Sequence, residues 1–213
     1  MWKFPLLMMV LFNTAMAQTA NRTVVLLHYA LDSFSHGKVL LKNGTSSLQV
    51  LNYNTLTGEM IFASNNRYLA IASPEDVDTV YIAHHKFVPV ANKFCEWLGG
   101  SQPALLKEYT CTIKEPEAEA GYGKTSTTAT TALKSLIHSG GAYNLTLPSD
   151  FELVPGTTFY LRSKGKFYKL TSAQQAAKLF PAKKQRIEEW IKTHPSKFTN
   201  EEEMVRFVQA IQD

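Results

Sequence analysis

Three glutamates on strand-like segments are the residues best suited to acid–base chemistry, namely Glu59, Glu96 and Glu108. Hydrolysis of a glycosidic bond uses two carboxyl groups held at a fixed separation in space. The spacing of residues along the chain does not give that separation, so a glycan or peptide hydrolase is one hypothesis, with its catalytic residues unassigned. The simpler interpretation is that these acids face solvent from half-buried strands.

A glycine-rich segment, residues 121–125 (GYGKT), resembles the end of a phosphate-binding loop. The full motif has a glycine five residues before its second glycine, and Ala118 occupies that place here. No apolar strand leads directly into the segment either. We interpret it as a turn within a loop, so we expect no nucleotide cofactor and no nucleic-acid partner.

Metal ligands are also missing at the expected spacings. His84 and His85 are adjacent, and neighbouring side chains on a strand point to opposite faces, so we do not expect both to bind one zinc ion. Residues 75–78 are acidic but lack the glycine and the distal glutamate of a calcium loop. The sequence therefore predicts no metal site and no cofactor. The Gly-x-Ser-x-Gly motif of serine hydrolases is absent as well.

The two cysteines, Cys95 and Cys111, lie on either side of the turn-like residues 99–103. If these two segments form a hairpin, the cysteines can come close enough for one disulfide, which an oxidising compartment permits. The alternative is a pair of buried thiols that pack as small apolar residues. The strand register decides between them and is not visible in the sequence.

Positive charge is concentrated near the C-terminus. The chain carries a formal net charge of +4, yet residues 162–197 alone hold ten Lys and Arg against two acids. Within this block, Lys183, Lys184 and Arg186 are candidate contacts for an anionic surface such as lipopolysaccharide or a polyanionic glycan. The alternative is a solvated helix face that the acidic last segment partly neutralises.

Short strands separated by turns fill residues 36–114, and Asn43-Gly44 predicts a type I′ hairpin turn. A single helical turn is expected at residues 73–76, with Ser73 as its cap and Pro74 at its first position. A second hairpin is expected over residues 158–170. These features predict an antiparallel β-rich domain, either a meander or a partly closed barrel, over residues 18–171.

Three helices are expected over residues 172–213, where Ser172 with Gln175, and Thr199 with Glu202, have capping-box spacing and Pro181 can open the middle helix. Apolar residues recur at helical spacing in the last two helices. Such stripes need a partner, so we predict an α+β fold with these helices packed on the sheet. The stripes consist of Ile187, Trp190 and Ile191, and of Met204, Phe207, Val208 and Ile211.

Residues 1–17 have the apolar run and the Ala15-Met16-Ala17 ending of a cleavable signal peptide, which predicts an exported, periplasmic or secreted protein. Gln18 follows, where a lipid-anchored bacterial protein has cysteine, so we expect no lipid anchor. No later segment is long and apolar enough to predict a membrane span. Residues 119–141 are rich in Gly, Ser and Thr and predict a flexible loop.

The chain resembles a group of uncharacterised small exported proteins of Gram-negative bacteria. The resemblance rests on residues 38–44 (KVLLKNG), 51–54 (LNYN) followed by Glu59-Met60, 121–123 (GYG) and 179–184 (LFPAKK). It implies an exported globular protein and assigns no catalytic residue. Because no catalytic signature is found, the leading hypothesis is a non-enzymatic protein that binds an envelope component or a protein partner, and the alternative is the hydrolase described above.

Overall fold

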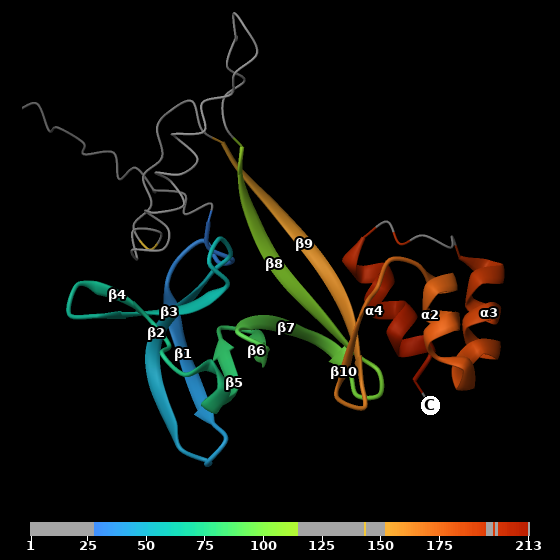
Figure 1. Ribbon diagram of the computed structural model, residues 1–213, viewed down its shortest axis with the longest axis horizontal. Helices are drawn as coiled ribbons and strands as arrows, with labels where there is room; N and C mark the ends of the chain where they lie inside the picture. The colour runs from blue at the N-terminus through green and yellow to red at the C-terminus, as the bar shows by residue number, and fades with distance from the viewer. Residues whose placement is uncertain (1–27, 115–142, 144–151, 195–197, 199, 213) are drawn as a thin grey trace, which may run out of the picture.

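The computed structural model describes residues 28–114, 143, 152–194, 198 and 200–212. Within these residues, the strands form one large antiparallel sheet, and the helices gather beyond one end of it (Figure 1). This arrangement confirms the α+β fold. The predicted signal peptide at 1–17 and the predicted loop at 119–141 lie outside the described residues.

The sheet has ten strands in the order β10-β9-β8-β7-β6-β5-β1-β2-β3-β4. Strands β1 to β4 pair in succession, β5 then joins the other edge of β1, and β5 to β10 again pair in succession. The bounds are β1 Ser35–Leu41, β2 Ser46–Asn54, β3 Glu59–Ser64, β4 Arg67–Ala70, β5 Val77–Ile82, β6 His85–Val90, β7 Lys93–Gly100, β8 Ala104–Lys114, β9 Glu152–Ser163 and β10 Lys166–Lys169.

The turns form where they were predicted, with differences in type. At the β1–β2 turn only Gly44 has a positive φ, of 87°, so the predicted type I′ turn is wrong there. The β3–β4 turn has a positive φ at both Asn65 and Asn66, which is the type I′ pattern. A 3-10 turn, η1 (Pro74–Asp76), has proline at its start as predicted, although the side chain of Ser73 makes no capping hydrogen bond.

The sheet curls without closing, and it consists of two meanders, β1 to β4 and β5 to β10, joined where β5 pairs with β1. The curl brings β3 against β7 and lets the Cys111 amide donate to the Thr55 carbonyl over 3.1 Å. One core fills the concave side of this curled half, with Leu51, Tyr53 and Phe87 fully buried in it. We call the sheet side that carries Phe87 the inner face and the opposite side the outer face.

The helices are α2 (Ala173–Leu179), the 3-10 turn η3 (Pro181–Lys183), α3 (Lys184–Thr193) and α4 (Glu201–Ala210). Ser172 accepts a hydrogen bond from the Gln175 amide over 3.2 Å, which confirms the first predicted cap. The cap predicted at Thr199 is wrong by one residue, since the Asn200 side chain accepts from the Glu203 amide over 2.9 Å. Asparagine is as good a cap as threonine, so spacing alone did not separate the two.

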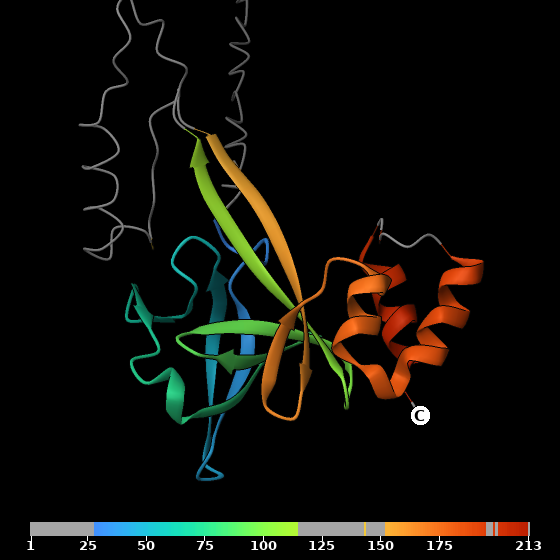
Figure 2. The same cartoon turned by 45° about the vertical axis from the view of Figure 1, so that its right-hand side comes forward.

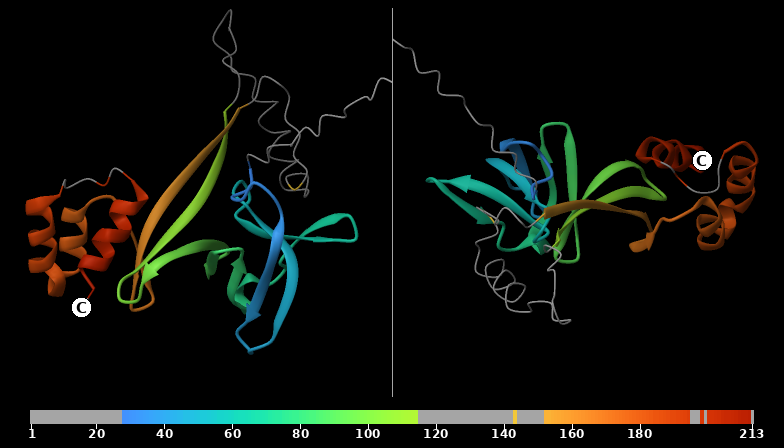
Figure 3. Two further views of the ribbon diagram at one scale, coloured as in Figure 1. Left: turned by 180° about the vertical axis from the view of Figure 1, so that it is seen from behind. Right: turned by 90° about the horizontal axis from the view of Figure 1, so that it is seen from above.

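A second core joins the helices to the inner face at the β7–β10 end, and it includes the predicted residues Ile187, Phe207, Val208 and Ile211. The predicted packing of helices on the sheet is therefore confirmed (Figure 3). Strands β8 and β9 continue beyond their neighbours as a twisted two-stranded arm (Figure 2). Among the described residues, no helix has the length and apolar character needed to cross a membrane.

Candidate functional site

The outer face carries a small apolar cluster that the helices do not cover. Val88, Cys95 and Leu106 are buried there, beneath the half-buried rings of Trp97 and Tyr160. Strand register explains the grouping, because Val88 lies opposite Cys95, and Leu106 lies opposite both Trp97 and Tyr160. We call the Trp97 and Tyr160 rings together the Trp97 shelf. Apolar side chains lie beneath these rings, and polar groups can reach their edges.

Two cations flank the Trp97 ring. The Lys86 Nζ atom lies 4.6 Å from the ring centroid, and the Arg162 Cζ atom also lies 4.6 Å from it. They come from opposite sides of β7, since Lys86 is on β6 and Arg162 is on β9. Neither cation forms a salt bridge within the described part of the chain. Contact with the indole holds both side chains in place and leaves their donors open to an anion.

A carboxylate, Glu108, lies on the same face. It accepts hydrogen bonds from the Lys93 ammonium and from the Tyr160 hydroxyl, each over 2.8 Å. Burial raises the pKa of Glu108, but these two hydrogen bonds and the charges of Lys93 and Lys169 outweigh it, so the net pKa lies below the ordinary value. Burial, followed by the bond to Glu108, raises the pKa of Tyr160 to about 12. Glu108 is therefore a charged acceptor at neutral pH.

The inner face has a different polar cluster, between the two cores. Glu96 pairs with His85 and accepts from the Tyr109 hydroxyl over 2.6 Å. Lys107 lies 4.4 Å from the centroid of the Tyr109 ring and forms a 2.6 Å salt bridge with Glu201 at the start of α4. Burial, followed by the hydrogen bond to Glu96, raises the pKa of Tyr109. This cluster joins the helices to the sheet.

The three candidate carboxylates, Glu59, Glu96 and Glu108, do not converge on one site as a hydrolase would require. Because Glu96 lies opposite Lys107, Glu96 and Glu108 project from opposite faces of the sheet. Glu59 accepts from the Tyr143 hydroxyl over 3.0 Å at the other end of the curled half. The expectation that all three face solvent is wrong for Glu96, which is buried with partners on both oxygens.

The histidines differ from expectation in geometry. His84 lies in the turn before β6, where Ala83 has a positive φ, so the strand rule for opposite faces does not apply. The rings of His84 and His85 have centroids 4.0 Å apart. Across the described residues, no group of three His, Cys, Asp or Glu side chains is arranged to hold a metal ion.

The two cysteines are free thiols in the structure, and both are buried. Register explains why they are not bridged: Cys95 belongs to the outer face, while Cys111 shares the inner face with Tyr109 on β8. Burial, followed by the charge of Glu108, raises the pKa of Cys95 to about 12, and burial also raises the pKa of Cys111. The structure therefore supports the alternative of two inert, packed thiols.

The predicted anion contacts, Lys183, Lys184 and Arg186, lie in η3 and at the start of α3. Lys183 is in η3, Lys184 pairs with Glu188 over 3.6 Å, and Arg186 donates to the Gln212 carbonyl. Lys184 also borders a groove of about 430 Å³ between α2 and α3. All three cations thus already have protein partners. Lys86 and Arg162 at the shelf have no carboxylate partner within the described residues, which makes them the better candidates.

The sequence analysis did not identify Lys86, Trp97 or Arg162. The three residues are separated by 11 and 65 positions and form no local motif. Only the strand order and register bring them together. Comparisons with models of protein families, with curated proteins and with solved structures find no match to this chain.

Proposed function

We propose that this protein is a non-enzymatic, exported protein that binds an anionic saccharide of the bacterial envelope on its outer face, around Trp97. The observation that carries the proposal is the pair of cations on the Trp97 ring, neither with a carboxylate partner among the described residues. Arginine matches the geometry of phosphate and carboxylate groups with two parallel hydrogen bonds. Export rests on the signal-like residues 1–17 and on the resemblance described above.

The surrounding charges favour an anion over a neutral ligand. Lys93 and Lys169 share the outer face with Lys86 and Arg162, and Glu108 is the acid that lies among them. Aromatic rings beside these cations suit a saccharide, because a ring face packs against the apolar face of a sugar while the cations bind its acidic substituents. Phe167, opposite Arg162 on β10 and 40% exposed, adds a further ring.

A hydrolase is the weaker alternative. It needs two carboxyl groups that converge on one bond, and the register separates Glu96 from Glu108. Each of these acids is also held by a hydroxyl and a basic side chain. The arrangement supports structural roles for both acids and leaves binding as the better-supported function.

Titration calorimetry with dextran sulfate and neutral dextran, which share a backbone, tests the proposal. Binding is expected for the sulfated polymer alone and should weaken with added salt, because screening reduces the attraction between exposed charges. Core oligosaccharide of lipopolysaccharide, with and without its phosphates, tests the envelope ligand in the same way.

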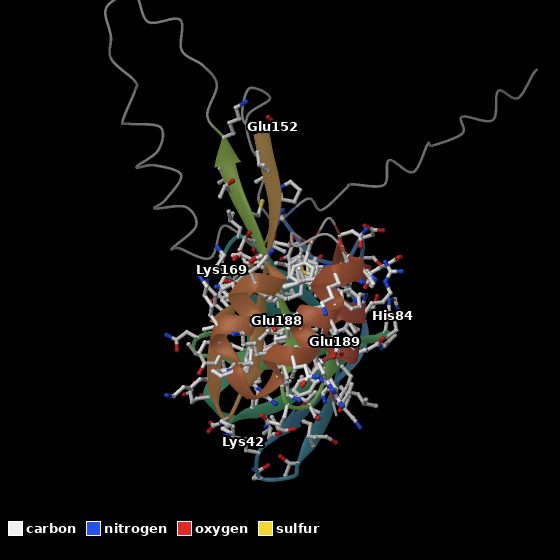
Figure 4. The ribbon with its side chains drawn as sticks, turned by 90° about the vertical axis from the view of Figure 1, so that its right-hand side faces the viewer. Lys42, His84, Glu152, Lys169, Glu188 and Glu189 are labelled. Carbon is white, nitrogen blue, oxygen red and sulfur yellow. The ribbon has the colours of Figure 1, made fainter. Side chains whose placement is uncertain are left out.

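The variant Arg162→Gln should weaken binding about tenfold, the loss expected when a hydrogen bond to a charged group is removed. The matched control is Lys42→Gln, which removes one positive charge far from the shelf. Figure 4 shows Lys42 at the end of the molecule opposite the Glu152 arm tip and well apart from Lys169. Equal binding by the two variants, or equal binding of charged and neutral polymers, would refute the proposal.

A further inference from the structure

A single row of side chains crosses most of the sheet on its outer face. Eight adjacent strands each contribute one residue that lies opposite the next. In their spatial order, these strands are β2, β1, β5, β6, β7, β8, β9 and β10. The row consists of Leu48, Lys38, Tyr81, Lys86, Trp97, Leu106, Tyr160 and Lys169. It passes through the Trp97 shelf and continues well beyond it on the side of β1.

Cations and rings alternate in the part of this row from Lys38 to Trp97. The Lys38 Nζ atom lies 5.6 Å from the centroid of the Tyr81 ring, as Lys86 lies over Trp97 at 4.6 Å. Within the row, Leu106 is fully buried, while Lys38 and Lys169 are exposed near its two ends. A single cation–ring pair, like that of Lys86 with Trp97, thus recurs at Tyr81 on the same face, two strands away.

The row is long compared with a single sugar. Eight strands span seven inter-strand spacings, or about 34 Å at roughly 4.8 Å each. Lys38 and Lys86 are two strands apart, which corresponds to about 10 Å along the row. A ligand that used both cation–ring pairs would need acidic groups at least that far apart.

We infer that the ligand is a linear acidic polysaccharide that lies across the strands, along this row, with several of its acidic groups bound at once. The inference rests on the proposed function and specifies the shape of the ligand. An extended chain fits because the cations repeat in one direction, and because a second bound group raises affinity through its high effective concentration once the first is held.

The experiment compares short dextran sulfate fractions, of two to three sugars, with long fractions of ten or more. The affinity per chain should rise steeply with length until the row is filled, and then level off. Lys38→Gln should weaken binding of the long fraction about threefold, as expected for one exposed ion pair, and should affect the short fraction less.

Lys42→Gln is the matched control, because Lys42 is four residues further along, is also exposed and carries the same charge. Arg162→Gln should weaken binding of both fractions. Affinity independent of length, or equal effects of Lys38→Gln and Lys42→Gln, would overturn the extended ligand. An effect of Arg162→Gln on the short fraction would in that case still support binding at Trp97, so the two failures are distinguishable.

Discussion

The two faces of this sheet use the same strands for opposite purposes. The inner face carries two apolar cores, one within the curl and one beneath the helices, with the Glu96 cluster between them. The outer face has a thin apolar layer, Val88, Cys95 and Leu106, covered by rings and cations. An antiparallel sheet can keep one face exposed to water, and here the exposed outer face carries the rings and cations that suit the proposed ligand.

The largest expected difference between the faces is in stability. Phe207 of α4 is fully buried on the inner side and contacts the rings of Trp190 and Phe198. Phe207→Ala should lower the free energy of unfolding by about 3 to 5 kcal/mol, through lost burial and the cavity left behind. The same substitution at Phe167, 40% exposed on the outer face, should change it by about 0.5 kcal/mol or less.

Urea denaturation of both variants measures the difference between them. Equal losses would contradict the assignment of the helices as cover for the inner face. If the proposed binding of dextran sulfate holds, a folded Phe207→Ala protein should retain it, because Phe207 lies away from the outer face.

A smaller effect is expected at the polar cluster between the cores. Glu96→Gln keeps the shape of the side chain but removes the charge that His85 and the Tyr109 hydroxyl contact. Because these partners are partly buried, the free energy of unfolding should fall by about 1 to 3 kcal/mol. Glu201→Gln is the control, since its pair with Lys107 is 39% exposed on the acid side and should contribute about 1 kcal/mol or less. Thermal or urea unfolding would show whether this order holds.

Acid titration separates Glu108 from the other carboxylates. Its folded-state pKa is below the ordinary value of 4.5, so the stability it contributes is present above pH 4.5 and is lost as the pH falls through the lower folded value. The difference in free energy of unfolding between the wild type and Glu108→Gln should therefore shrink below pH 4.5. Glu152→Gln, which removes an exposed carboxylate at the tip of the arm (Figure 4), is the matched control. A constant difference at Glu108 would refute its pairing with Lys93 and Tyr160.

The sequence predicted the local elements well, and the reasons are local. Hairpin turns depend on residues such as Gly44 and Asn66 that tolerate a positive φ, and the cap at Ser172 depends on a side chain three residues from its donor. The position of β1 between β2 and β5 was not predictable, because it depends on which strands pair across the sheet.

The candidate site depends on the same long-range pairing. Lys86, Trp97 and Arg162 are ordinary strand residues until β6, β7 and β9 are placed in order. The basic block did point to the C-terminal third of the chain, and Arg162 and Lys169 belong to that block. The particular cations chosen, Lys183, Lys184 and Arg186, were on helices, because a local charge run is visible in a sequence and a row across strands is not.

The smallest expected effect concerns the two cysteines, which the register places on opposite faces of the sheet. Two free thiols predict two alkylated cysteines by intact mass in denaturant without prior reduction, although the proposed export to an oxidising compartment would permit a disulfide. In the native protein, alkylation at pH 8 should be slow at Cys95. Its pKa near 12 leaves little thiolate, and the half-buried Trp97 and Tyr160 cover the cluster that contains it.

Arg162→Gln and Lys86→Gln should leave the alkylation rate of Cys95 nearly unchanged if the rings alone shield the thiol, whereas Trp97→Ala should increase that rate. Unalkylated cysteines in denaturant would mean a disulfide, and with it a strand register different from the one on which the two-faced sheet depends.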